Sequence, residues 1–250
     1  MSATVQDLES RAHSGPHALD EFLRSNRFPL VDGRTVTFVY IGAADSVHLR
    51  HWLHGLPNSL QFQRIGHTPV WRLTIDIPER SRVEYKLEVH RGGHRQLITD
   101  PLNENYARDP YGANSVVRGA GYEDPEWARH DPEARLGEIQ EMEIDAKSFG
   151  DKRNLLVYLP ARYRPTRRYP LLIAHDGPDY MKFAQLRTAL DNLIHRLDVQ
   201  PMVVAMTQSP NRLTEYANDE RHARFLAHDV LPALESRYSL IRDPEARCLM

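Results

Sequence analysis

The side chains best placed for chemistry follow a short apolar run in the second half of the chain. The segment RRYPLLIAHDGPDY, residues 167–180, is typical of a buried strand that ends in a loop with His175, Asp176 and Gly177. Open α/β sheets bind ligands in loops at the carboxyl ends of their strands. Gly177 lets the backbone approach a substrate closely, and its N–H could donate to an oxyanion that develops during acyl transfer. The alternative is that Asp176-Gly177-Pro178 is a plain turn, since Asp-Gly and Gly-Pro pairs commonly mark turns.

A second polar loop, TQSPNRLTEYANDE at residues 207–220, follows another apolar run. Its Arg212, Glu215 and Tyr216 have the charges and the ring to bind an acidic or catechol-like group of a substrate. The alternative is an exposed ion pair between Arg212 and Glu215, which is the common fate of surface charges. The predicted substrate-binding residues of the two loops are His175, Asp176, Arg212, Glu215 and Tyr216.

Both loops need a sheet that brings them to one edge. Pro170 to Ala174 and Met202 to Met206 are short and almost wholly apolar, as strands buried on both faces are. Apolar residues at helical spacing in 183–197 and 225–234 predict a helix after each strand. This order predicts right-handed crossovers and an α/β domain over residues 137–250, with a mostly parallel sheet covered by helices. The other predicted strands are Glu138 to Ile144 and Leu155 to Leu159, an antiparallel pair joined around Gly150, and Arg247 to Met250.

The first half of the chain alternates between apolar and polar residues with a period of two. Strands are predicted at 35–41, 46–51, 61–65, 71–77, 83–89 and 95–99. Short strands at this spacing predict an all-β sandwich over residues 35–118. Within residues 1–34, Pro16 followed by apolar residues at helical spacing predicts a short helix. Residues 119–136 carry many charges together with Gly and Pro, and they are predicted to be a linker.

A family resemblance rests on ordered segments within residues 137–250. These are YPLLIAHDG, PMVVAM, RLTEY, FLAHDVLPALESRY and ARCLM, and their order resembles the esterase D superfamily, most closely its enterochelin (ferric enterobactin) esterase branch. The resemblance implies an incomplete α/β-hydrolase domain and hydrolysis of a carboxylic ester, such as a siderophore ester, through a serine acyl-enzyme. In that family the strand resembling ARCLM leads into a G-x-S-x-G nucleophile elbow, followed by the catalytic His and acid.

The 250 residues contain no G-x-S-x-G. We therefore expect the chain to end just before its nucleophile and to be inactive by itself. In this scheme Gly177 is the candidate backbone donor to the oxyanion, and His175 is a loop residue near the site.

The strands of residues 35–118 resemble the immunoglobulin-like domain that precedes the catalytic domain in such esterases, and more loosely the glycogen-binding modules of starch-branching enzymes. The segments that carry this likeness are VHLRHWLHG, VWRLTIDIP, VEYKLEV and DPLNENYARDPYGANSVV. Sugar binding needs exposed aromatic side chains such as Trp52, whereas Trp71 is in phase with Leu73 and Ile75 and is expected in the core. The alternative function is a non-catalytic glycan- or partner-binding protein built on a degenerate esterase scaffold.

Composition and motif content disfavour nucleic-acid-binding, membrane-spanning, secreted and metal-binding proteins. The 32 Lys and Arg against 34 Asp and Glu leave a net charge of -2, so no nucleic-acid partner is expected. No apolar run approaches about 18 residues, so no membrane span is expected. The single Cys248 and the absence of a signal-peptide pattern favour the cytoplasm. His48, His51 and His54 lack evident carboxylate or Cys partners, so we expect no metal and no cofactor. The expected partner is a small-molecule ester, for example a ferric siderophore.

Overall fold

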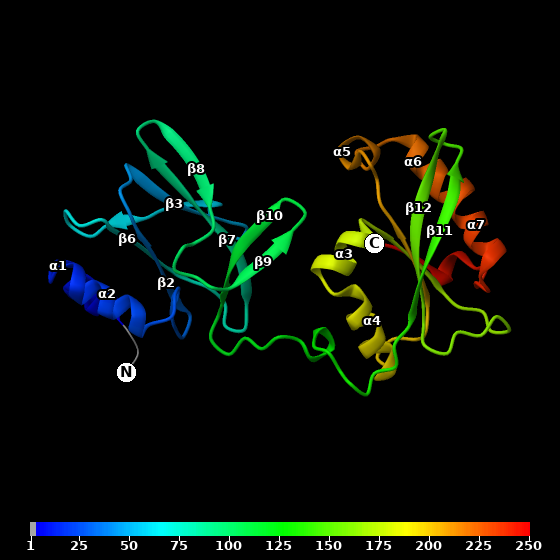
Figure 1. Cartoon of the computed structure of the whole chain (residues 1–250), viewed down its shortest axis with the longest axis horizontal. Coiled ribbons are helices and arrows are strands. Elements are labelled where there is room, and N and C mark those ends of the chain that lie inside the picture. The colour runs from blue at the N-terminus through cyan, green and yellow to red at the C-terminus, as the bar shows by residue number, and fades with distance from the viewer. Residues whose placement is uncertain (1–3) are drawn as a thin grey trace. The chain divides into compact units, whose positions relative to one another are not determined.

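The computed structural model describes residues 4–250 and divides into two compact units, one ending at Glu123 and the other running from Asp124 to Met250 (Figure 1). The boundary lies inside the segment predicted to be a linker. Within residues 4–250 the strands form three sheets, and the chain is a mixed α/β protein.

The first unit begins with the helices α1, Val5–His13, and α2, Pro16–Ser25. The sequence predicted α2 but not α1, although Thr4 and Asp7 form a reciprocal capping box that fixes the start of α1. Buried apolar side chains of both helices share a cluster with residues of the first sheet. The N-terminal segment is therefore packed into the first unit.

The strands of the first unit pair antiparallel in two sheets within the described residues. The first sheet has the order β1-β2-β6-β5, with β1 at Leu30–Asp32, β2 at Thr35–Ile41, β6 at Val70–Asp76 and β5 at Gln63–Arg64. The second has the order β4-β3-β7-β10-β9, with β4 at Ser59–Gln61, β3 at Ser46–His51, β7 at Arg82–Arg91, β10 at Gly112–Arg118 and β9 at Tyr106–Asp109; β8, His94–Ile98, also pairs with β7.

These two sheets enclose one core. Phe38 and Trp71 of the first sheet cluster with Leu49 and Tyr85 of the second, and the rings of Phe38 and Tyr85 lie 4.8 Å apart. Trp71 is 6% exposed, as its phase in the strand predicted. Residues 35–118 thus contain the two facing layers of a sandwich, while an immunoglobulin-like topology stays a prediction.

The predicted strand 61–65 is two strands and not one. β4 ends at Gln61 in the second sheet and β5 begins at Gln63 in the first. Phe62, between them, is 2% exposed, and its N–H donates to the carbonyl of Val47 at 2.8 Å. The chain crosses from one sheet to the other at this residue, which a period-two pattern does not reveal.

The second unit contains a sheet with the order β11-β12-β14-β13-β15. Its strands are β11 at Glu138–Ala146, β12 at Asp151–Leu159, β14 at Val203–Thr207, β13 at Leu171–His175 and β15 at Arg247–Leu249. β13 is parallel to β14 and β15, whereas β12 is antiparallel to both β11 and β14. The sheet is therefore more mixed than predicted, because the hairpin strand β12 joins the parallel part in the opposite direction.

Helices cover both faces of this sheet (Figure 1). They are α3 at Gly177–Phe183, α4 at Leu186–His195, α5 at Arg212–Glu215, α6 at Glu220–Arg224, the π-helical segment η2 at Phe225–Val230 and α7 at Leu231–Arg237; 3₁₀ turns lie at Glu126–Ala128 (η1) and Pro244–Ala246 (η3). Leu190 and Ile194 of α4 pack on one face with Val204 and Met206, while Phe225, Val230 and Leu234 pack on the other.

The helix predicted over 183–197 is broken and shorter than expected. Gln185 has a left-handed backbone with φ 53°, which separates α3 from α4. Leu197 lies beyond α4 and is 85% exposed, so its predicted place in the apolar stripe is wrong. The helical spacing of 225–234 is confirmed, although part of that helix is π-helical.

Part of the predicted linker packs on the second unit. Asn192 of α4 donates to the carbonyl oxygens of Trp127 and Arg129 at 2.9 and 2.6 Å. Asn192 is 1% exposed, so these bonds satisfy a buried amide.

Candidate active site at the carboxyl edge of β13 and β14

The two polar loops emerge side by side from parallel strands. β13 and β14 pair in register up to His175 and Thr207, and His175 Nδ1 lies 3.1 Å from the Thr207 hydroxyl. His175 is the last residue of β13 and not a loop residue. The sequence therefore placed both loops at the correct edge of the sheet.

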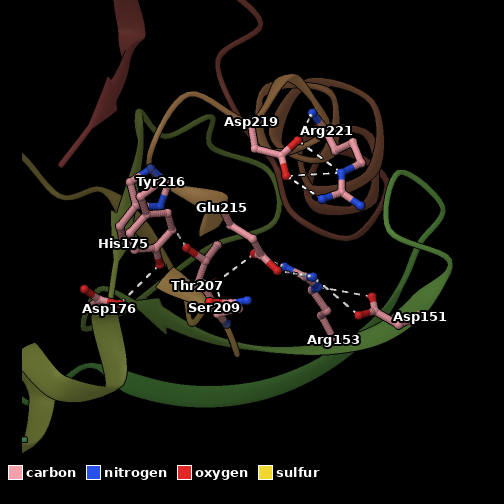
Figure 2. Close-up of polar contacts among 11 residues, drawn as sticks. Asp151, Arg153, His175, Asp176, Thr207, Ser209, Glu215, Tyr216, Asp219 and Arg221 are labelled. Atoms are coloured by element: carbon pink, nitrogen blue, oxygen red, sulfur yellow. Dashed lines mark hydrogen bonds and ion pairs between the residues drawn. The ribbon is translucent and has the colours of Figure 1, made fainter. Parts of the chain in front are cut away.

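Asp176 joins the two loops through its carboxylate. Its backbone is left-handed, with φ 50°. One carboxylate oxygen accepts a hydrogen bond from the Tyr216 hydroxyl at 3.2 Å, and the other pairs with Arg212 Nη2 at 3.0 Å (Figure 2 shows Asp176 and Tyr216). The structure thus brings three predicted site residues together. The alternative pairing of Arg212 with Glu215 is replaced by a contact across the two loops.

Glu215 lies beside this group but points to the sheet. It is 6% exposed and accepts two hydrogen bonds from Arg153, at 2.7 and 2.8 Å (Figure 2). The Ser209 hydroxyl donates a third at 2.8 Å. Mainly through the bonds from Arg153, the pKa of Glu215 is held below its usual value. Both carboxylate oxygens are engaged inside the protein, so substrate binding by Glu215 stays only a prediction.

The rings of His175, Tyr216 and His222 form a compact group. Their centroids are 4.9 to 5.0 Å apart in each pairing. Burial lowers the pKa of both histidines, and the nearby charge of His222 lowers that of His175 further. Burial, reinforced by Asp176, raises the pKa of Tyr216 to about 12. At neutral pH the group therefore offers uncharged imidazoles and a phenol that remains a hydrogen-bond donor.

Gly177 begins α3 in close contact with β14. A Cβ added to this residue would lie 2.2 Å from Met206 Cβ, so any side chain would overlap the strand. Close packing alone explains the glycine. Donation from its backbone N–H to an oxyanion stays a proposal.

The sequence analysis missed Arg153 and His222. Arg153 lies in phase with Leu155 and Val157, which are buried, and an Arg at an inward-facing strand position must find a carboxylate. That signal was available in the sequence. His222 lies just after the second polar loop, and it was missed because its packing against His175 at the end of β13 is a tertiary contact.

No metal site is formed among residues 4–250 by three or more His, Cys, Asp or Glu side chains. His51 is 1% exposed, and its Nδ1 accepts a hydrogen bond from the Leu53 N–H at 3.0 Å. Among the same described residues, no helix has the length and apolar character that crossing a bilayer requires.

A pocket of about 520 Å³ lies away from this group, at the end of the sheet where β13 and β14 begin. Glu138, Leu159 and Tyr163 are among the residues that line it, and no residue of the two polar loops does. We therefore locate the candidate site by its side chains and not by this cavity.

Residues 146–249 match the model of the family described as "Putative esterase". The uncharacterized protein YjcH of Bacillus subtilis (strain 168) is 26% identical over 109 residues, which are 41% of this chain and 45% of that protein. Residues 146–249, which the family model matches, contain both polar loops.

Solved esterases share the fold. The enterochelin esterase from Shigella flexneri has a TM-score of 0.67 at 17% identity, covering 91% of this chain and 67% of that chain. The ferric enterobactin esterase from Salmonella typhimurium has a TM-score of 0.65 at 19% identity, covering 85% and 64%. The enterobactin esterase of Shigella flexneri, solved in the presence of 2,3-di-hydroxy-N-benzoyl-serine, has a TM-score of 0.63 at 17% identity, covering 85% and 62%. The chain thus spans less than half of the curated relative and about two thirds of the solved structures.

Proposed function

We propose that this chain, an esterase-like protein of the superfamily that these matches define, carries the substrate-orienting part of a carboxylic-ester hydrolase. The observation that carries the proposal is the Asp176–Arg212–Tyr216 group, which lies at the carboxyl edge of a parallel strand pair and within the residues that match the esterase family. Ligands bind at this edge in open α/β sheets.

The proposed reaction is acyl transfer through a serine acyl-enzyme. The backbone N–H of Gly177 would donate to the oxyanion that forms when the ester carbonyl is attacked. The nucleophile would come from a G-x-S-x-G elbow, which does not occur in these 250 residues. His175, with its pKa lowered by burial, lines the site and is not assigned as the general base.

The chemistry of the group favours an ester that carries an anionic or catechol group. Arg212 is 43% exposed at its side chain and presents a planar fork of donors that suits a carboxylate or catecholate. Tyr216 adds a neutral donor, and the neighbouring rings add an aromatic surface. A siderophore ester fits this description, in line with the compound present in the solved Shigella esterase.

Binding tests the substrate class directly. We expect the chain to bind 2,3-dihydroxybenzoyl-serine saturably in isothermal titration calorimetry, and more weakly as salt is raised, because the contact with Arg212 is electrostatic. Methyl benzoate, a neutral ester, is the matched probe and should bind more weakly. Equal affinity for both compounds, or no saturable binding of either, would contradict the proposed substrate class.

Covalent labelling tests the reaction assignment. The sequence lacks a G-x-S-x-G elbow, so we expect a fluorophosphonate probe to label no serine stoichiometrically and an activated aryl ester to show no saturable turnover. Labelling together with turnover would place a nucleophile elsewhere in these residues and would refute the assignment.

A further inference from the structure

The Arg153–Glu215 pair is buried and makes several contacts. Their side chains are 7% and 8% exposed, and the contact is bidentate. The Arg153 guanidinium also lies 3.8 Å from the ring centroid of Phe149 and 5.0 Å from that of Phe225, and it contacts Asp151 at 3.1 Å. The guanidinium is therefore held from several sides in one orientation.

Glu215 is the last residue of α5, a helix of four residues. A helix this short does not persist without tertiary contacts, because it closes hardly more than one turn. Glu215 follows Arg212 by three residues and directly precedes Tyr216. Whatever fixes Glu215 therefore also fixes the two residues that contact Asp176.

Ser209 adds a second tie at the start of the loop. Its hydroxyl donates to Glu215 at 2.8 Å and accepts from the Asn211 N–H at 3.0 Å. Glu215 thus connects β12, the first residues of the loop and α5 (Figure 2).

A buried ion pair of this kind is expected to fix the orientation of the elements that it joins more than to stabilise the fold. Removing two charges from water is costly, and replacing a buried ion pair by apolar side chains is often neutral or stabilising. What an apolar pair cannot reproduce is the directed, two-point contact that sets the rotation of α5.

We propose that the buried Arg153–Glu215 pair is the positioning device of the candidate site, holding α5 so that Arg212 and Tyr216 meet Asp176 and face the ligand. Arg153 and Glu215 are then positioning residues that do not touch substrate. The ligand-facing part rests on the proposed function.

The test removes both charges together, since a single substitution leaves an unpaired buried charge and could unfold the chain. The variant is Arg153→Met with Glu215→Met. The control is Arg247→Met with Glu235→Met, which removes a 2.6 Å ion pair of the same unit that does not contact the candidate site. Hydrogen exchange is followed at the Thr214 and Tyr216 amides, which bond to Asn211 and Arg212, and at the amides of β14.

We expect the test variant to lose protection of the Thr214 and Tyr216 amides by about tenfold or more, while β14 keeps its protection and the melting temperature changes little. Affinity for 2,3-dihydroxybenzoyl-serine should fall by about tenfold or more. The control should change neither the exchange of α5 nor the affinity.

Unchanged protection of α5 in the test variant would overturn the proposal, and so would loss of protection in β14 by the same factor, because that would be global destabilisation. If α5 loses protection but the unaltered chain does not bind the probe, the positioning role stands and the proposed substrate class fails. The two ideas therefore fail separately.

Discussion

The carboxylate of Asp176 holds both loop residues that we assign to the substrate. Arg212 and Tyr216 each contact a different oxygen of this group. In the proposed site an anionic ligand would share the Arg212 guanidinium with Asp176, because a guanidinium carries five N–H donors.

Replacement of Arg212 by Ala should reduce binding without unfolding the chain. The Arg212–Asp176 pair is partly exposed, so its loss should cost less than about 1 kcal/mol of unfolding free energy. Affinity for 2,3-dihydroxybenzoyl-serine should fall by about 2 kcal/mol, which is typical of a hydrogen bond to a charged group. Calorimetric titration and thermal melting measure the two effects.

Arg224→Ala is the matched control, because Arg224 forms an exposed pair with Glu220 on α6. It should change neither quantity. An equal loss of affinity for a neutral aromatic ester in Arg212→Ala would show that the residue supports the shape of the site and does not recognise charge.

His222 should make stability fall in mild acid. Its ring nitrogens are buried without hydrogen-bond partners, and burial lowers its pKa. In the unfolded chain a histidine has its ordinary pKa of about 6.5, so below that pH the unfolded chain binds more protons than the folded chain. The contribution of His222 to the unfolding free energy is therefore fully present above about pH 6.5 and is lost as the pH falls toward the lowered pKa of the folded state. Urea unfolding at about pH 7.5 and about pH 5.5 measures the loss.

His222→Phe should shrink this loss, because Tyr216 and Phe225 surround the ring and phenylalanine carries no proton. His130→Phe, at an exposed position of the same unit, is the control and should leave the pH dependence unchanged. The same pH dependence in His222→Phe as in the unaltered chain would assign the loss to other groups, His175 first among them.

At the scale of elements, α3 depends on a glycine that lets it touch β14. Gly177→Ala should destabilise the chain by about 1–3 kcal/mol, because the added methyl group overlaps Met206. Alanine keeps the backbone N–H, so this variant tests packing and not the proposed donor. Urea unfolding gives the value.

Gly150→Ala is a useful comparison, since Gly150 has φ 76° and open space around it. It should cost about 1 kcal/mol through the backbone alone. A Gly177→Ala variant as stable as the unaltered chain would show that α3 can move away from β14.

How far the sequence predicts these elements depends on whether the deciding contact is local. The alternation around Trp71 and the apolar runs of β13 and β14 are local patterns, and they correctly predicted these strands and the edge from which the two polar loops emerge. The sheet crossing at Phe62 and the break at Gln185 are set by backbone conformation and tertiary packing, so periodicity could not show them.

The same limit applies to the site. The sequence predicted Asp176, Arg212 and Tyr216 as site residues because each follows a buried strand, and the structure brings the three together. It could not pair Glu215 with Arg153, since these residues are 62 positions apart. Glu215 pairs with Arg153 and not with Arg212 because Arg153 lies at an inward-facing position of β12.

For the whole molecule, separate cores predict separate unfolding. Leu49 belongs to the core of the first unit and Leu234 to that of the second, and both are fully buried. Leu→Ala at either site should cost about 2–5 kcal/mol. In differential scanning calorimetry, each variant should lower only the transition of its own unit.

The unaltered chain should accordingly show two transitions. A single transition that both variants lower equally would mean that the units unfold as one cooperative body.

The π-helical segment Phe225–Val230 bears on how this chain tolerates changes in length. Phe225 and Val230 are five residues apart and both are buried, whereas Val230 and Leu234 have the ordinary spacing of four. A π-helix closes its hydrogen bonds over five residues and an α-helix over four, so a π-helical turn contains about one residue more. Deleting the exposed Ala227 would convert the five-residue interval to four and leave both apolar side chains facing the sheet. The segment Phe225–Val230 therefore contains one residue more than its packing on the sheet requires. A natural relative with one residue fewer in this segment could keep the same core.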